Sequence, residues 1–144
     1  LVRDRGDGRR GSTTLPSVGK HSVTHVKLRK PIGNYSMIEC RLETGRTHQI
    51  RVHMQSIGFP LVCDTLYGDG LPLYLSRLKP GYKISKHEES ERPLLNRLAL
   101  HAMELIFTDA DGKQITLQAE LPKELQVTLL QLRKYARQKN TSFR

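Results

Sequence analysis

Two pairs of short segments, in which apolar and polar residues alternate, constrain the fold of this chain more than any other feature of its sequence. Residues 22–30 and 35–43 alternate on either side of the Pro-Ile-Gly-Asn stretch at 31–34. Residues 97–109 and 114–121 alternate on either side of an Asp-Gly pair. A period of two is typical of strands with one buried face, and Gly, Asn and Asp between such strands favour tight turns. We therefore predict two β-hairpins.

A helix is predicted after the first hairpin, over residues 47–57. The Thr-Gly pair before it breaks the strand, Thr47 can cap the helix, and Gly58 suits the position just past its end. Apolar residues at helical spacing should form its buried stripe. These residues are Ile50, Met54 and Ile57.

A second amphipathic helix is predicted after the second hairpin, over residues 123–138, with Pro122 at its start. Residues 1–20 and 68–96 are punctuated by Gly, Pro or Ser and are expected to be loops, the second of them with little burial and high mobility. The order of strands, helix, strands and helix predicts an α+β domain with a largely antiparallel mixed sheet and flanking helices. The buried stripe of the second helix should consist of Leu125, Leu129, Leu132 and Ala136.

The charge of the chain is unevenly distributed. Of the net charge of +10, residues 1–30 contribute eight Lys and Arg against two Asp, and residues 125–144 contribute five basic residues and no acid. Basic ends around a near-neutral middle favour a polyanionic partner, and nucleic acid above all. The apolar runs are too short to span a bilayer. The two cysteines show no metal-ligand spacing, which favours a reducing compartment such as the cytoplasm.

The segment at the first predicted helix is dense in cationic and hydrogen-bonding side chains. Arg51 lies at the border of the predicted apolar stripe, where its planar fork could hold either a carboxylate or a phosphate. A structural salt bridge and a functional role are both open for it on this reasoning. His48 and His53 are five residues apart, which is not the spacing of a helical metal pair, so we expect no metal site. The candidate binding residues of the segment are Arg46, Thr47, His48, Gln49 and His53.

The stretch LETGRTHQIRVHMQSIGFPLVCDTLYG, residues 42–68, resembles the signature of the RluA-type RNA pseudouridine synthases. That signature runs L-x-T-G-R-T-H-Q-I-R-V-H, then G-x-P-[IL], then D-x-x-Y-G. The later stretches RLALHA (97–102) and LPKEL (121–125) resemble two further motifs of the same family in the same order. In one departure, Cys63 stands where the family usually has glycine. We expect local repacking around it rather than loss of function.

The resemblance implies an isomerase that converts uridine in ribosomal or transfer RNA to pseudouridine without cofactor or metal. An aspartate attacks, the glycosidic bond breaks, and the base turns and rejoins the ribose through carbon 5. By resemblance, Arg51 pairs with that aspartate, whereas Asp64 matches a different position that we interpret as structural. The family carries its nucleophile in an earlier H-R-L-D segment, and this chain has no R-L-D.

We therefore expect residues 1–144 to be the C-terminal portion of a pseudouridine synthase catalytic domain, inactive alone and monomeric when full length. Two alternatives come from other classes of protein. One is a non-catalytic RNA-binding module, which the missing aspartate favours and the intact arginine motif disfavours. The other is a phosphodiesterase using His48 and His53, which a five-residue spacing disfavours because it separates two helical side chains by about 140°.

Overall fold

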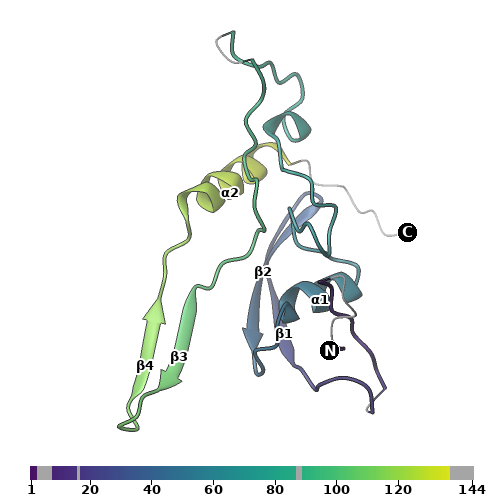
Figure 1. The fold of residues 1–144 in the computed structure, drawn as a ribbon. Helices are drawn as coiled ribbons and strands as arrows, with labels where there is room; N and C mark the ends of the chain where they lie inside the picture. The colour runs from purple at the N-terminus through teal and green to yellow at the C-terminus, as the bar shows by residue number, and fades with distance from the viewer. Residues whose placement is uncertain (3–7, 16, 87–88, 137–144) are drawn as a thin grey trace, which may run out of the picture.

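The structure of the chain, a computed structural model, describes residues 1–2, 8–15, 17–86 and 89–136 (Figure 1). These residues form an α+β fold of two antiparallel hairpins, two α-helices and one short 3-10 helix, as the order of the sequence segments predicts. The elements are β1 (Thr24–Ile32), β2 (Tyr35–Leu42), α1 (Gln49–Ser56), η1 (Leu75–Arg77), β3 (Glu104–Thr108), β4 (Gln114–Gln118) and α2 (Lys123–Tyr135).

The first hairpin has the register that its alternation predicts. Val26 pairs with Cys40 and Leu28 with Ile38, so the apolar residues of the two strands share a face. Relative to the prediction, β1 is shifted by two residues towards the turn and β2 ends one residue earlier. The turn is confined to the two residues between Ile32 and Tyr35 and not to four, with Gly33 at a φ of 62°. Glycine adopts this left-handed conformation without steric cost, which explains the tight turn.

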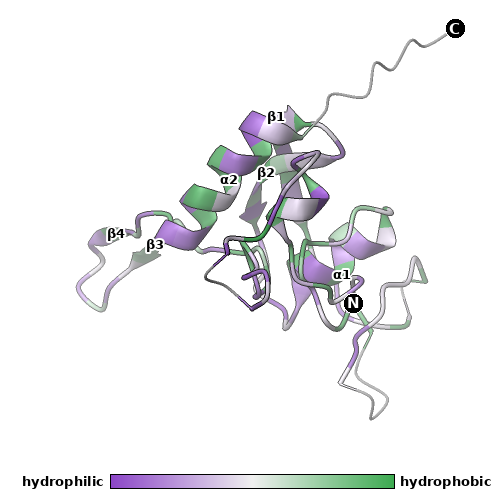
Figure 2. Cartoon of the chain, turned by 90° about the horizontal axis from the view of Figure 1, so that it is seen from above, coloured by the Kyte–Doolittle hydropathy of each residue, from purple (hydrophilic) through white to green (hydrophobic). Residues whose placement is uncertain are grey.

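The two hairpins form separate two-stranded sheets and not the single larger sheet expected from the sequence. In Figures 1 and 2, β3 and β4 extend away from the rest of the molecule. Much of the predicted buried face is therefore exposed: Val26 and Leu28 are 45% and 57% exposed, and Leu105 and Leu117 are 58% and 54% exposed. Within the described residues, the two hairpins leave these apolar faces uncovered.

The hydrophobic core lies where α2 packs against the turn end of the first hairpin and the segments around Cys63, Leu73 and Leu95. The predicted stripe of α2 is confirmed, and Figure 2 shows hydrophobic and hydrophilic residues alternating around this helix. Pro122 occupies the position before its first residue, also as predicted. The predicted last turn of this helix falls partly on residues 137–138, which lie outside the described residues. The buried core residues are Ile32, Cys63, Leu73, Leu78, Leu95, Leu125 and Leu132.

The helix α1 is shorter than predicted and presents a different face to the protein. It begins at Gln49, after His48 in the left-handed conformation at φ 58°, so the expected cap by Thr47 is wrong. Gln49, Val52 and Met54 are buried, whereas Ile57, expected in the stripe, is 58% exposed. The cause is a set of hydrogen bonds from the Gln49 side chain, described below, which fixes the rotation of the helix.

Three leucines anchor the segment 68–96 in the core, whereas the described residues between 79 and 94 are not buried, in line with the expected low burial of this segment. Leu73 and Leu95 are each 3% exposed and form an isolated antiparallel bridge, with the Leu73 amide donating to the Leu95 carbonyl. Leu78, just after the turn of η1, is also buried. Such burial opposes the chain entropy that would otherwise favour mobility.

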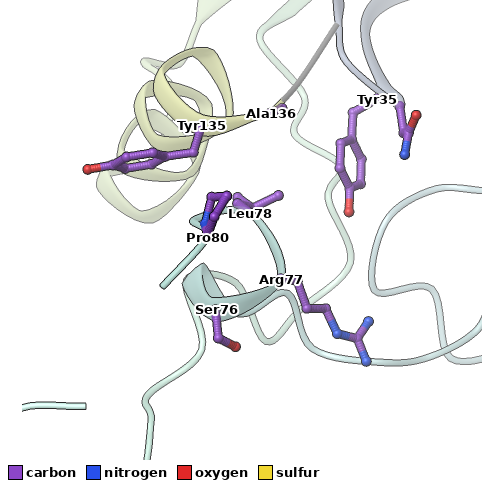
Figure 3. Close-up of a pocket in the computed structure, with 8 residues that line it drawn as sticks. Tyr35, Ser76, Arg77, Leu78, Pro80, Tyr135 and Ala136 are labelled. Atoms are coloured by element: carbon purple, nitrogen blue, oxygen red, sulfur yellow. The ribbon is translucent and has the colours of Figure 1, made fainter. Parts of the chain in front are cut away.

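A cavity of ≈590 Å³ opens beside η1 and the end of α2 (Figure 3). Its walls carry two tyrosines, one from the start of β2 and one from the last turn of α2, together with the Arg77 side chain. None of the candidate residues between Arg46 and His53 lines it. None of the described helices is long and apolar enough to cross a membrane.

Candidate functional site

The turn that leads into α1 is held by the buried side chain of Gln49. Its amide nitrogen donates to the carbonyl of Val23 and to Oγ1 of Thr24 on the first hairpin, at 2.9 and 3.0 Å. Its amide oxygen accepts from Thr44 Oγ1 at 2.8 Å and from the backbone N–H of Arg46 at 3.1 Å. Gln49, predicted as an RNA contact, is 2% exposed, and in this structure its side chain fixes α1 to β1.

His53, one turn further along α1, faces the same hairpin. Its ring nitrogens lie 2.9 Å from Thr24 Oγ1 and 3.2 Å from Ser22 Oγ. Burial lowers the pKa of His53 below its ordinary value, so the ring is mainly neutral at pH 7. Both nitrogens are engaged within the protein, and the structure therefore favours a packing role over the predicted RNA contact.

Arg51 lies on another face of α1 and forms a bidentate ion pair with Asp64. Its Nε donates to Oδ2 at 2.8 Å and its Nη2 donates to Oδ1 at 2.6 Å. The side chain of Asp64 is 0% exposed and that of Arg51 is 14% exposed, so the pair is largely shielded from water. Shielded, doubly hydrogen-bonded pairs of this kind hold a guanidinium in one plane.

Backbone groups complete the environment of the Asp64 carboxylate. Its Oδ1 also accepts from the N–H of Leu66 at 3.0 Å and from the N–H of Tyr67 at 2.9 Å. Burial on its own would raise the pKa of Asp64, but the hydrogen bonds from Arg51 and from these two N–H groups lower it below the ordinary value. Hydrogen bonding to Asp64 in turn raises the pKa of Arg51. Both partners are therefore charged at neutral pH.

Tyr67 packs against the guanidinium. Its ring centre lies 5.0 Å from Cζ of Arg51, within the range of a cation–π contact. Its hydroxyl lies 3.1 Å from Nδ1 of His48 and accepts from the N–H of Arg10 at 2.8 Å. The rings of His48 and Tyr67 meet edge to face with centroids 5.6 Å apart. His48 thus supports Tyr67, which in turn supports Arg51.

The loop that carries Asp64 is constrained at two positions, by a left-handed backbone at Cys63 and by close packing around Gly68. Cys63 has a φ of 58°, a conformation that favours glycine, and its buried thiol lies 3.5 Å from the carbonyl of Leu95. A Cβ added at Gly68 would lie 3.0 Å from the carbonyl of Asp64 and 3.1 Å from that of Leu61. Glycine at position 68 therefore avoids a close contact with the backbone of the same turn. At position 63, by contrast, the cysteine side chain fits into the hydrophobic core.

The structure thus brings Arg51 and His48 together and places the other predicted residues apart from them. Arg46 and Thr47 are exposed on the turn before α1. Reasoning from sequence did not identify Tyr67, and it did not foresee that Asp64 is the partner of Arg51. A signal for Asp64 was available: an arginine at the border of a buried face needs a carboxylate, and Asp64 is followed by a turn that offers N–H donors.

The described residues hold no cluster of His, Cys, Asp or Glu that could bind a metal.

Comparison with known proteins identifies the family of this chain. The family model described as RNA pseudouridylate synthase matches residues 5–56, which include Arg51. A ribosomal large subunit pseudouridine synthase D of Zymomonas mobilis is 43% identical over 110 residues, covering 76% of this chain and 31% of the relative. The chain belongs to the RNA pseudouridylate synthase family. This bears out the resemblance seen in its motifs.

Two further members of the pseudouridine synthase family show the same partial overlap. The ribosomal large subunit pseudouridine synthase D of Neisseria meningitidis serogroup B is 40% identical over 116 residues, covering 80% of this chain and 29% of the relative. A Bacillus subtilis protein named uncharacterized RNA pseudouridine synthase YlyB is 38% identical over 135 residues, covering 93% of this chain and 37% of the relative. The chain therefore spans about a third of the length of the curated relatives it matches.

Proposed function

We propose that residues 1–144 form the C-terminal portion of the catalytic domain of an RNA pseudouridine synthase that isomerises uridine to pseudouridine in ribosomal or transfer RNA. The observation that carries this proposal is the rigid mounting of Arg51 within the motif that matches the family. Two relatives are named for the large ribosomal subunit, which makes its RNA the first substrate to test.

The nucleophile belongs, on this proposal, to a segment outside these residues. Asp64 cannot take the role, because its side chain is 0% exposed and its oxygens accept from Arg51 and from two backbone N–H groups. An attacking carboxylate must instead reach the ribose of a bound nucleotide. The exposed apolar faces of both hairpins support the existence of further packing partners, since an isolated two-stranded hairpin is only marginally stable.

Of the residues predicted to contact RNA, we propose that the two exposed ones, Arg46 and Thr47, do so. Arg46 and Thr47 lie on the turn immediately before α1, the helix that carries Arg51. A cation and a hydroxyl at this place suit a phosphate of the RNA backbone. On this proposal His48 does not contact the RNA but supports Tyr67, which packs on Arg51. Gln49 and His53 hold α1 on the hairpin.

The proposed reaction consumes no cosubstrate, because isomerisation of uridine neither adds nor removes atoms. From the family resemblance we propose an enzyme without metal or cofactor, acting in the cytoplasm as a monomer. Charge supports RNA as the partner, because the net charge of +10 lies mainly at the two ends of the chain.

Activity is tested by restoring the full-length protein to a strain that lacks its gene. Pseudouridine is then mapped by chemical probing in ribosomal and transfer RNA. We expect at least one uridine to be modified only when the protein is present. An RNA that binds the protein but acquires no pseudouridine would contradict the enzymatic proposal and favour a non-catalytic RNA-binding module.

The affinity of the isolated chain for single-stranded RNA should fall steeply with salt. With about five phosphate contacts and a slope near −0.7 per contact, the association constant should drop roughly a hundredfold between 50 and 200 mM salt. Replacing Arg46 with alanine should remove about one phosphate contact and so make the salt dependence shallower by about 0.7 in slope. Fluorescence anisotropy measures both quantities. An affinity that does not change with salt would contradict an electrostatic RNA interface.

A further inference from the structure

The buried Asp64 carboxylate accepts four hydrogen bonds, two from Arg51 and two from the backbone of its own loop. Both of its oxygens accept from the guanidinium, and Oδ1 accepts in addition from the backbone N–H groups of Leu66 and Tyr67. The backbone bonds fix the carboxylate to its own loop, and the bidentate pair fixes the guanidinium to the carboxylate. Any movement of Arg51 in its plane would therefore break at least one of these bonds.

Tyr67 restrains the guanidinium in the remaining direction. Its ring lies against Arg51, and its position is set by the edge-to-face contact with His48 and by the N–H of Arg10. A guanidinium carries five N–H donors, of which the Nε and one Nη2 donor face Asp64. The two Nη1 donors and the second Nη2 donor do not contact Asp64. The outer edge of the fork, between Nη1 and Nη2, has the geometry to bind a second carboxylate in the same bidentate way.

We propose that Asp64 is a positioning residue of the synthase, which aims the outer edge of the Arg51 guanidinium at the nucleophilic carboxylate. This inference rests on the proposed function. Asp64 touches neither RNA nor the reacting atoms, and it acts only through Arg51. It also balances the charge of Arg51, so that the nucleophile receives oriented hydrogen bonds from a pair that is already neutral as a whole.

The test is a double-mutant cycle in the full-length enzyme, read as single-turnover rates of pseudouridine formation. We expect Asp64→Asn to lower the rate on the order of ten- to a hundredfold, because a small displacement of a positioning group is costly, while the Kd for RNA stays unchanged. In an Arg51→Lys background, the same substitution should change the rate by less than about twofold, because the group through which it acts is already altered.

Arg29→Lys provides the matched control background, since Arg29 forms an ion pair with Glu39 on the exposed hairpin. There Asp64→Asn should cost as much as it does in the wild-type enzyme. A purely structural role for Asp64 would give equal losses in the Arg51→Lys and Arg29→Lys backgrounds and would overturn the inference. A wild-type enzyme that forms no pseudouridine would instead overturn the proposed function, so the two failures are distinct.

Melting curves show whether each variant folds. If Asp64→Asn does not yield a folded enzyme, Asp64→Glu is used in the same cycle. It keeps the charge but places the carboxylate about one bond further out, which displaces the guanidinium. The same coupling to Arg51→Lys is then expected, and additive losses would again contradict the positioning role.

Discussion

In the full-length enzyme, Arg51→Lys is expected to reduce the single-turnover rate about a hundredfold, whereas Arg46→Lys should have a much smaller effect. Lysine keeps the charge at position 51 but loses the planar fork, so it cannot both grip the two oxygens of Asp64 and offer a further edge to a second carboxylate. Loss of one oriented charged contact is worth on the order of 3 kcal/mol, which corresponds to this factor in rate.

Arg46→Lys serves as the comparison because Arg46 is exposed on the turn before α1. A lysine there can still reach a phosphate as a point charge, so the substitution is conservative only at this position. Melting curves of both variants control for stability. Near-normal rates for Arg51→Lys, together with loss of activity for Arg46→Lys, would show that the roles assigned to the two arginines are reversed.

The isolated chain of 144 residues is expected to form no pseudouridine on any RNA. The carboxylate that the structure shows on Arg51 is Asp64, which is buried and fully hydrogen-bonded, and the chain has no R-L-D segment that could supply the nucleophile. Positioning residues cannot replace a missing nucleophile.

The measurement is chemical mapping of pseudouridine after incubation with total RNA from a strain lacking the full-length enzyme. The full-length enzyme is the positive control, and circular dichroism establishes that the chain used is folded. Site-specific pseudouridine that depends on the chain would contradict the proposal that the nucleophile lies elsewhere.

The secondary structure could be predicted from sequence because it is set by local patterns. Alternation over 22–30 and 35–43 predicted the first hairpin with its apolar pairs, and helical spacing of leucines predicted α2 with its buried face. The way in which the elements pack was less accessible. The structure has two separate hairpins where a single sheet was expected. This could not be predicted, because pairing between hairpins depends on tertiary contacts that no local pattern encodes.

The site shows the same division at the level of single residues. Arg51 was correctly placed on a helix, although that helix buries a different face from the predicted one, and the family motif drew attention to it. The burial of Gln49 was missed, since a polar residue enters the interior only when tertiary partners satisfy it, and those partners lie on β1 and the turn before α1. The same limit hid the contact between Arg51 and Tyr67, which joins a helix to a loop.

A crystal structure of the full-length protein tests the central claim most directly. The account predicts that Arg51 keeps its bidentate pair with Asp64 and that a carboxylate from a segment outside residues 1–144 lies within hydrogen-bond distance of the outer edge of the guanidinium. An Arg51 whose outer edge faces solvent or a main-chain carbonyl, with every other carboxylate remote, would contradict it.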